Sequence, residues 1–164
     1  MNYRPKTVSG RVALDSGAWR PKWASWLELR AICRLEREVF LDPISLSAAS
    51  RYWLSPKSGY LVVHDQGNLA AYLGLEVQGA SAHILANVTD PRYRQRGLAR
   101  FLLNAGAGEV RKLGARWLMG EVRASNHIQM HALERVGFIA AGVVPRFFSN
   151  GEDAILYWWM LDPL

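Results

Sequence analysis

Apolar and polar positions follow two different periods along this chain, and these periods divide it into helices and strands. Over residues 27–40, apolar residues recur every three or four positions with arginine and glutamate between them, which predicts an amphipathic helix. The segment LDPIS ends that helix, because a residue before proline disfavours the helical conformation. A second, shorter helix is predicted over residues 45–54.

The middle of the chain has the pattern of antiparallel strands. Three apolar runs, 59–65, 69–77 and 82–89, are separated by the short polar turns QGN and QGAS. They predict a meander of three strands, and Asp90-Pro91 ends the third strand.

A helix and a strand follow the meander. Apolar residues at helical spacing predict a helix from Gly97 to Leu113, and residues 115–123 read as a strand. Because this strand follows a strand and a helix, we expect a parallel crossover. Gly106 and Gly108 lie inside the helix, where each costs about 1 kcal/mol relative to alanine. We therefore expect close packing or a kink at these glycines.

The C-terminal part is predicted to hold one helix and two strands. Residues 125–138 read as a helix that Asn126 and Gln129 cap and Gly137 ends. Strands are predicted over 138–148 and 153–161, joined by the polar turn SNGE.

No repeat or linker divides the chain of 164 residues, so we expect one mixed α/β domain. Residues 1–25, which contain the sequence RPK twice, are expected to be a basic N-terminal extension with a first strand over 7–14. Residues 26–164 are expected to form the functional domain.

Composition narrows the partners that this domain could have. The net charge of +6 favours an anionic partner, such as nucleic acid, an acidic peptide, a membrane surface or a phosphorylated cofactor. The single cysteine, Cys33, excludes an intrachain disulfide and is expected to be a buried thiol. The N-terminus lacks the apolar segment of a signal peptide, and no run approaches membrane-spanning length. We expect a cytoplasmic protein that does not contact membranes.

The stretch DPRYRQRGLARFLL lies between a predicted strand and a predicted helix. The start of a helix offers unpaired backbone N–H groups and the positive end of the helix dipole. Gly97 and Ala99 leave room for a phosphate to approach the backbone, and Arg94, Arg96 and Arg100 add positive charge. We therefore predict a cradle for a phosphate or a pyrophosphate.

The spacing of Arg94, Gly97 and Ala99 resembles the R/Q-x-x-G-x-G/A motif of the GNAT superfamily, the acyl-CoA-dependent N-acyltransferases. The blocks GEVRASN, ERVGF and FFSNGEDAILYWWM resemble the branch that acetylates protein N-termini, in particular the bacterial ribosomal-protein-alanine N-acetyltransferases. The resemblance is clear over 82–160 and looser over 27–80. It implies a single-domain α/β fold with a mixed, mostly antiparallel sheet, a central parallel splayed pair of strands and flanking helices.

The resemblance also implies where acetyl-CoA binds. The backbone of Asn87, Val88 and Thr89 would pair with the pantetheine arm, and a backbone N–H there would polarise the thioester carbonyl. Asn126 matches an asparagine that lies near the pantetheine. The pyrophosphate would be held mainly by the main-chain amides of the cradle, which consists of Arg94, Gln95, Arg96, Gly97, Leu98, Ala99 and Arg100.

Glu121 matches the general base of the family. An α-amine, with a pKa of about 7.7–8.0, is largely protonated at neutral pH and must lose a proton before it attacks. A carboxylate that faces the cleft could take this proton directly or through a water. The alternative is that Glu121 is only the ion-pair partner of Arg116 or Arg123.

Two departures from the family pattern concern the acceptor side. Leu133 stands where the family has the tyrosine that gives a proton to the leaving thiolate, and no general acid is assigned. His131 is two residues away and falls near the opposite side of the helix. Phe147 and Phe148 stand where tyrosines often border the peptide cleft, which weakens the assignment of a ribosomal-protein substrate.

We expect an N-acetyltransferase that moves an acetyl group from acetyl-CoA to a protein or peptide N-terminal amine, by direct attack in a ternary complex. A lysine or a small-molecule amine is the alternative acceptor. Leu133 leaves open a non-catalytic acyl-CoA-binding module. A nucleic-acid binder is the weakest interpretation, since the arginines gather at one turn without a nucleic-acid-binding motif. No metal is expected, because the histidines lack metal-binding spacing, and the protein is expected to be a monomer or homodimer.

Overall fold

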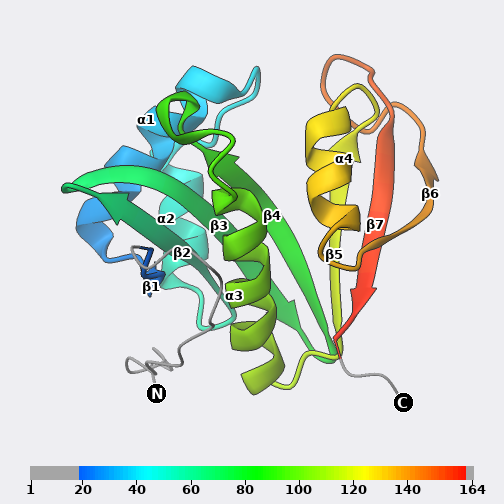
Figure 1. The fold of residues 1–164 in the computed structure, drawn as a ribbon, viewed down its shortest axis with the longest axis horizontal. Helices are drawn as coiled ribbons and strands as arrows, with labels where there is room; N and C mark the ends of the chain where they lie inside the picture. The colour runs from blue at the N-terminus through cyan, green and yellow to red at the C-terminus, as the bar shows by residue number, and fades with distance from the viewer. Residues whose placement is uncertain (1–18, 162–164) are drawn as a thin grey trace.

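A seven-stranded sheet, in the order β1-β2-β3-β4-β5-β7-β6, runs through the structure, a computed structural model that describes residues 19–161 (Figure 1). The strands are β1 (Lys22–Trp23), β2 (Ser58–Asp65), β3 (Asn68–Gln78), β4 (Ser81–Thr89), β5 (Trp117–Arg123), β6 (Ile139–Val144) and β7 (Ala154–Met160). The helices are α1 (Leu29–Val39), α2 (Leu46–Leu54), α3 (Leu98–Lys112) and α4 (His127–Glu134), with short 3-10 turns η1 (Trp26–Glu28) and η2 (Pro91–Tyr93).

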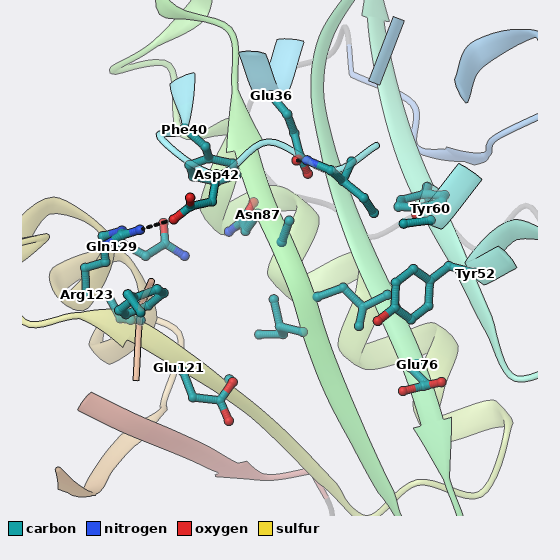
Figure 2. A pocket seen from close by; sticks show the side chains of 18 of the residues that line it. Glu36, Phe40, Asp42, Tyr52, Tyr60, Glu76, Asn87, Glu121, Arg123 and Gln129 are labelled. Atoms are coloured by element: carbon teal, nitrogen blue, oxygen red, sulfur yellow. Dashed lines mark hydrogen bonds and ion pairs between the residues drawn. The ribbon is translucent and has the colours of Figure 1, made fainter. Parts of the chain in front are cut away.

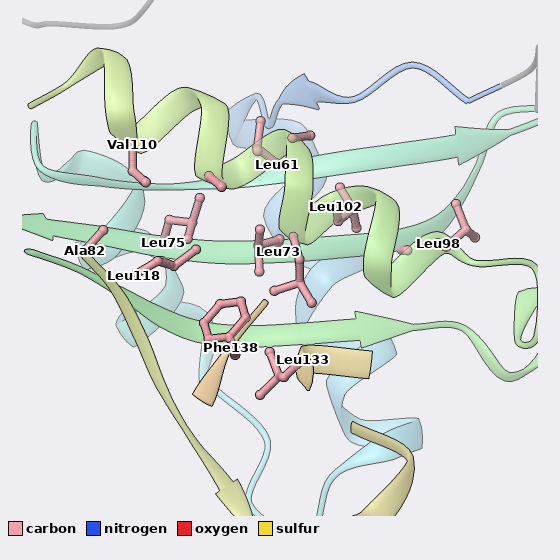
Figure 3. Packing of buried hydrophobic residues seen from close by; sticks show 14 of the residues in the cluster. Leu61, Leu73, Leu75, Ala82, Leu98, Leu102, Val110, Leu118, Leu133 and Phe138 are labelled. Carbon is pink, nitrogen blue, oxygen red and sulfur yellow. The ribbon is translucent and has the colours of Figure 1, made fainter. Parts of the chain in front are cut away.

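The helices cover both faces of the sheet. α3 and α4 lie on one face, and α1 and α2 lie on the other (Figure 1). Leu102 and Val110 of α3 face β3, the strand that carries Leu73 and Leu75, in one buried cluster, as Figure 3 shows, and Leu98 at the start of α3 belongs to the same cluster. On the opposite face, a second cluster joins α1 and α2 to the sheet; its buried members include Leu29, Ile32, Tyr60, Val62, Tyr72 and Val88.

β4 and β5 are the parallel pair of the sheet, and they separate soon after they begin. Only three residue pairs are in register, the last of them His83 with Met119. Beyond this pair the strands diverge, as Figure 1 shows. We call the gap between β4 after His83 and β5 after Met119 the fork. The predicted parallel splayed pair and the mostly antiparallel sheet around it are confirmed.

A β-bulge in β4 changes which side chains face which helices. Gly74 pairs with Ala86, whereas the next residue of β3 pairs with Ile84, so Leu85 is the extra residue. Ala82 before the bulge packs in the cluster beneath α3, whereas Val88 after it packs in the cluster beneath α1 and α2. The bulge therefore turns the side chains of Asn87 and Thr89 toward the face that α3 covers.

Most of the predicted elements are confirmed, with ends that differ by one to a few residues. The predicted strand over 138–148 is wrong in its second half, because β6 ends at Val144 and a turn follows. Proline lacks the N–H of a ladder bond, and Arg146 has a φ of 51°, which an extended strand cannot contain. The strand predicted over 7–14 lies outside the described residues.

The two glycines inside α3 differ in how closely other side chains approach them. A Cβ at Gly106 would overlap Leu73 Cδ2 and would meet Leu75 Cδ1 at 3.0 Å, so this glycine lets the helix approach the sheet. A Cβ at Gly108 would meet nothing within 4 Å. The expected close packing is therefore confirmed at Gly106 but not at Gly108.

The same substitution at these two positions should have opposite effects. Gly106→Ala is expected to lower the free energy of unfolding by about 1–3 kcal/mol, since Leu73 and Leu75 are buried and must move. Gly108→Ala should raise it by about 0.5–1 kcal/mol, because alanine favours the helix. Urea unfolding of both variants tests this. Equal effects would contradict the packing argument.

Candidate active site

The fork opens into a cleft with a cavity volume of about 770 Å³. This volume lies within the range of about 300–1,000 Å³ typical of small-molecule sites. β4 and β5 form its floor and sides, and α2, α4 and the loop between α1 and α2 complete its walls (Figure 2). Its charged lining residues are Glu36, Asp42, Arg51, Glu76, Glu121 and Arg123.

The predicted phosphate cradle lies in the connection from β4 to α3. Gly97 caps α3 with a φ of 78°, and Gln95 also has a positive φ, of 62°. The first backbone bond of the helix runs from Phe101 N to Gly97 O, so the amides before Phe101 have no intrahelical partner. Leu98 is 1% exposed, and its side chain belongs to the core, so it offers no side-chain group to the predicted cradle.

The arginines around the cradle do not all have the same role. Arg92 makes a bidentate pair with the buried Asp90, with Nη2 to Oδ2 at 2.7 Å, and the hydrogen bonds from Arg92 hold the pKa of Asp90 below its ordinary value. This pair stabilises the turn. Arg94, Arg96 and Arg100 are exposed at the cradle, and Arg96 lies 5.3 Å from the centre of the Tyr93 ring.

Two polar atoms at the end of β4 lack partners among the described residues. Asn87 donates through Nδ2 to Ala99 O at 3.4 Å, but its Oδ1 is buried and has no hydrogen bond. The Thr89 hydroxyl is likewise buried without a partner. Because buried polar atoms are nearly always satisfied, the end of β4 beside α3 suits a bound polar ligand.

Glu121 points from β5 into the cleft (Figure 2). Its Oε2 lies 2.6 Å from Nε2 of His83 on β4, and neither Arg116 nor Arg123 pairs with it. The alternative of an arginine partner is therefore wrong. The hydrogen bond from His83 lowers the pKa of Glu121, and the hydrogen bond to Glu121 raises the pKa of His83 although burial opposes this.

The matching family and the similar structures agree with this geometry. Residues 23–138 match the profile of the Acetyltransferase (GNAT) family. The chain belongs to this family. It is accordingly an N-acetyltransferase, and the predicted fold and class of enzyme are confirmed.

The chain is similar to several proteins of known name. It is similar to the ribosomal protein bS18-alanine N-acetyltransferase of Escherichia coli, with 33% identity over 95 residues, which cover 56% of this chain and 64% of the relative. The crystal structure of the Escherichia coli ribosomal-protein-S18-alanine N-acetyltransferase superposes with a TM-score of 0.80 at 25% identity, over 89% of this chain and 96% of that one.

Two further similar proteins are named for different acetyltransferase activities. N-alpha-acetyltransferase 30 of Schizosaccharomyces pombe is 27% identical over 138 residues, which cover 79% of this chain and 89% of the relative. The crystal structure of nourseothricin acetyltransferase has a TM-score of 0.73 at 21% identity, over 88% of this chain and 99% of that one. The fold alone therefore does not select the acceptor.

Leu133 is part of the core. By the resemblance to the N-terminal acetyltransferases, it stands where that branch of the GNAT family has the proton-donating tyrosine. It is 1% exposed and lies close to Phe138, as Figure 3 shows. Asn126 lines the cleft and caps α4, because Gln129 N donates to its Oδ1 at 3.1 Å. Among the described residues of α4 that line the cleft, Asn126, Gln129 and Leu133, none can donate a proton as an acid.

Tyr93 and Tyr157 carry hydroxyl groups that could donate a proton, but both lie outside the cleft. Tyr157 OH donates to Glu134 Oε1 at 2.9 Å, and burial together with this bond raises the pKa of Tyr157 to about 12. Tyr93 lies against the arginines of the cradle. Neither belongs to the lining of the cleft.

A polar bridge closes one end of the cleft. Arg123 Nη2 lies 3.3 Å from Asp42 Oδ2 and Arg123 Nη1 lies 3.1 Å from Glu152 Oε2, so the α1–α2 loop is joined to the β6–β7 loop (Figure 2 shows the first pair). The Arg123 guanidinium also lies 4.0 Å from the centre of the Phe148 ring. Phe148 is thus a wall of the cleft, whereas Phe147 is 48% exposed.

Buried Glu36 holds the α1–α2 loop in place. Its two carboxylate oxygens accept hydrogen bonds from Ile44 N, at 2.5 Å, and from Tyr72 OH. The sequence alone gave no sign of this role, because Glu36 lies in a helix that is rich in charged residues.

Within residues 19–161, no group of three or more histidine, cysteine or acidic residues is placed to hold a metal ion. Over the same residues, no helix is long and apolar enough to cross a bilayer. Cys33 is buried, as expected.

The pair of His83 and Glu121 should make stability depend on pH. A raised histidine pKa contributes stability that is present below the ordinary value of 6.5 and is lost as pH rises through the raised pKa. A lowered glutamate pKa contributes stability that is present above 4.5 and is lost as pH falls. Glu121→Gln should therefore lower the free energy of unfolding most between these pH values, by at most about 1 kcal/mol because the pair is partly exposed.

Urea unfolding across this pH range measures the effect. Glu109→Gln is the matched control, since Glu109 pairs with Lys112 at 2.6 Å and lysines keep their charge throughout the range. A loss of stability in Glu121→Gln that stays constant with pH would contradict the ion pair.

Proposed function

We propose that this GNAT enzyme transfers the acetyl group of acetyl-CoA to the α-amine of a protein or peptide N-terminus. The observation that carries the proposal is the arrangement of the fork: an anion cradle at the end of one diverging strand and a carboxylate on the other. The resemblance to ribosomal-protein-alanine N-acetyltransferases and the similarity to the Escherichia coli enzyme support this acceptor over a lysine or a small amine.

The residues around the cradle fit the pyrophosphate of CoA. Backbone amides at the start of α3, the open space at Gly97 and the exposed Arg94, Arg96 and Arg100 would hold it. The backbone of Asn87, Val88 and Thr89 would pair with the pantetheine arm at the fork, where β4 no longer pairs with β5. The partnerless oxygens of Asn87 and Thr89 support a polar ligand at this place.

Glu121 is the general base in this proposal. It is the carboxylate on the β5 wall of the cleft, and a base is needed because the acceptor arrives as an ammonium ion. Four carboxylates line the cleft, against the two cations Arg51 and Arg123, so its walls suit a cationic acceptor although the whole chain has a net charge of +6.

The cradle can be tested with two valine substitutions. Gly97→Val adds a branched side chain where the phosphate would approach, and we expect it to weaken CoA binding by at least about tenfold, or 1.4 kcal/mol. Gly79→Val is the matched control, because Gly79 also has a positive φ, of 62°, but lies at the opposite end of β4. Titration calorimetry with CoA measures both affinities. Absence of CoA binding by the unmodified protein would overturn the proposed function.

The base can be tested by Glu121→Gln, which keeps the shape of the side chain and removes its basicity. We expect kcat to fall by about 10²–10⁴-fold, the usual contribution of general base catalysis, with CoA affinity unchanged. Mass spectrometry of acetylated N-terminal peptides, lysine peptides and small amines would first identify the acceptor. CoA binding without any acetylated product would favour a non-catalytic acyl-CoA-binding module, the alternative that Leu133 raises.

A further inference from the structure

We propose that Glu121 works together with His83, and that the imidazole receives the proton of the acceptor amine from Glu121 and releases it to solvent. The inference rests on the proposed function and adds a residue of β4 to it. His83 does not touch the acceptor in this scheme; it positions Glu121 and accepts the proton through it.

The position of His83 suits this role. His83 and Met119 are the last residue pair before the fork, and Glu121 lies two residues further along β5 on the same face. This register brings His83 Nε2 to 2.6 Å from Glu121 Oε2. The His83 side chain is 36% exposed and that of Glu121 is 20% exposed. One end of the pair therefore faces the cleft and the other reaches solvent.

The charged groups around His83 favour its protonated form. Glu76 of β3 is its direct neighbour across the strands, so the imidazole lies between two carboxylates on adjacent strands. Hydrogen bonding to Glu121 raises the pKa of His83, and the charges of Glu121 and Glu76 add to this effect. Across the cleft, α2 presents Arg51 and Tyr52.

Proton balance shows what the pair must do. The acceptor enters as an ammonium ion and Glu121 takes one of its protons. This proton moves to His83 Nε2, which is free to accept it when the neutral imidazole carries its own proton on Nδ1. The amine nitrogen then forms the new C–N bond, and the C–S bond of the thioester breaks. A second proton leaves that nitrogen and ends on the CoA sulfur, so the products are the amide, CoA thiol and one proton released from His83.

This scheme does not require a proton donor at Leu133. The α4 wall of the cleft holds no acid, and the other residues of β5 that line it are Gly120, Val122 and Arg123. His83 gives the proton a separate route, because it lies on the other strand of the fork.

The test compares two histidine variants in steady-state assays with the acceptor peptide that the unmodified enzyme acetylates best. His83→Gln keeps a hydrogen-bond donor toward Glu121 but cannot carry a proton, and we expect kcat at neutral pH to fall by about tenfold or more, short of the full effect of losing a base. His64→Gln is the matched control, because His64 also pairs with a glutamate, Glu28, at 3.2 Å, but lies outside the cleft. It should leave kcat unchanged.

The pH profile separates proton transfer from a structural role. In the unmodified enzyme, kcat/KM should fall on the acid side as His83 becomes protonated, since a protonated imidazole cannot accept another proton. In His83→Gln this decline should disappear from that pH range. The NMR titration of His83 should give the same pKa, above 6.5, and Glu121→Gln should lower it.

The possible results distinguish this inference from the proposed function. Unchanged kcat and an unchanged acid limb in His83→Gln would overturn the role of His83 while leaving Glu121 as the base. An NMR pKa of His83 that stays the same in Glu121→Gln would show that the two groups do not interact, and it would overturn the inference without any activity assay. Loss of CoA binding or unchanged activity of Glu121→Gln would instead count against the proposed function.

Discussion

The separation of β4 from β5 is the constraint on which the site depends. Parallel strands in a sheet normally satisfy each other's backbone groups along their length, yet these two share only three residue pairs. At the start of the fork they approach closely, because a Cβ at Gly120 would lie 3.2 Å from Ile84 Cβ. Beyond that point each strand is held by its other neighbour, β3 or β7. A single buried cluster, which includes Leu73 of β3, Leu118 of β5 and Tyr157 of β7, joins the two half-sheets on the face that α3 covers.

The fork also explains how a basic chain presents an acidic cleft. The arginines of the β4–α3 connection lie at the end of β4, whereas Glu76 and Glu121 lie on the strand faces inside the cleft. A cofactor with phosphate groups and a cationic amine would therefore approach the fork from regions of opposite charge. The net charge of the chain is a sum over both regions, so it describes neither the basic connection nor the acidic cleft.

Sequence patterns predicted much of the fold but less of the pairing within the site. The geometry of the predicted cradle could be foreseen because its strand, glycine turn and helix are contiguous, so local structure fixes where the amides lie. The GNAT motif predicted Glu121, whereas the partners predicted for it were arginines close to it in the sequence. The true partner, His83, is 38 residues away and on another strand.

The sequence by itself determined the order of helices and strands, including the strand, glycine turn and helix of the predicted cradle, and the strand that carries Glu121, because periodicity and short motifs are local properties. Only the tertiary structure decided that His83 hydrogen-bonds to Glu121, that Leu85 is the extra residue of a β-bulge and that Leu73 packs closely against Gly106. Strand register is the physical reason for the first two: a slip of one residue would turn every side chain to the other face. The third depends on how closely α3 lies on β3, which packing sets and no local pattern records.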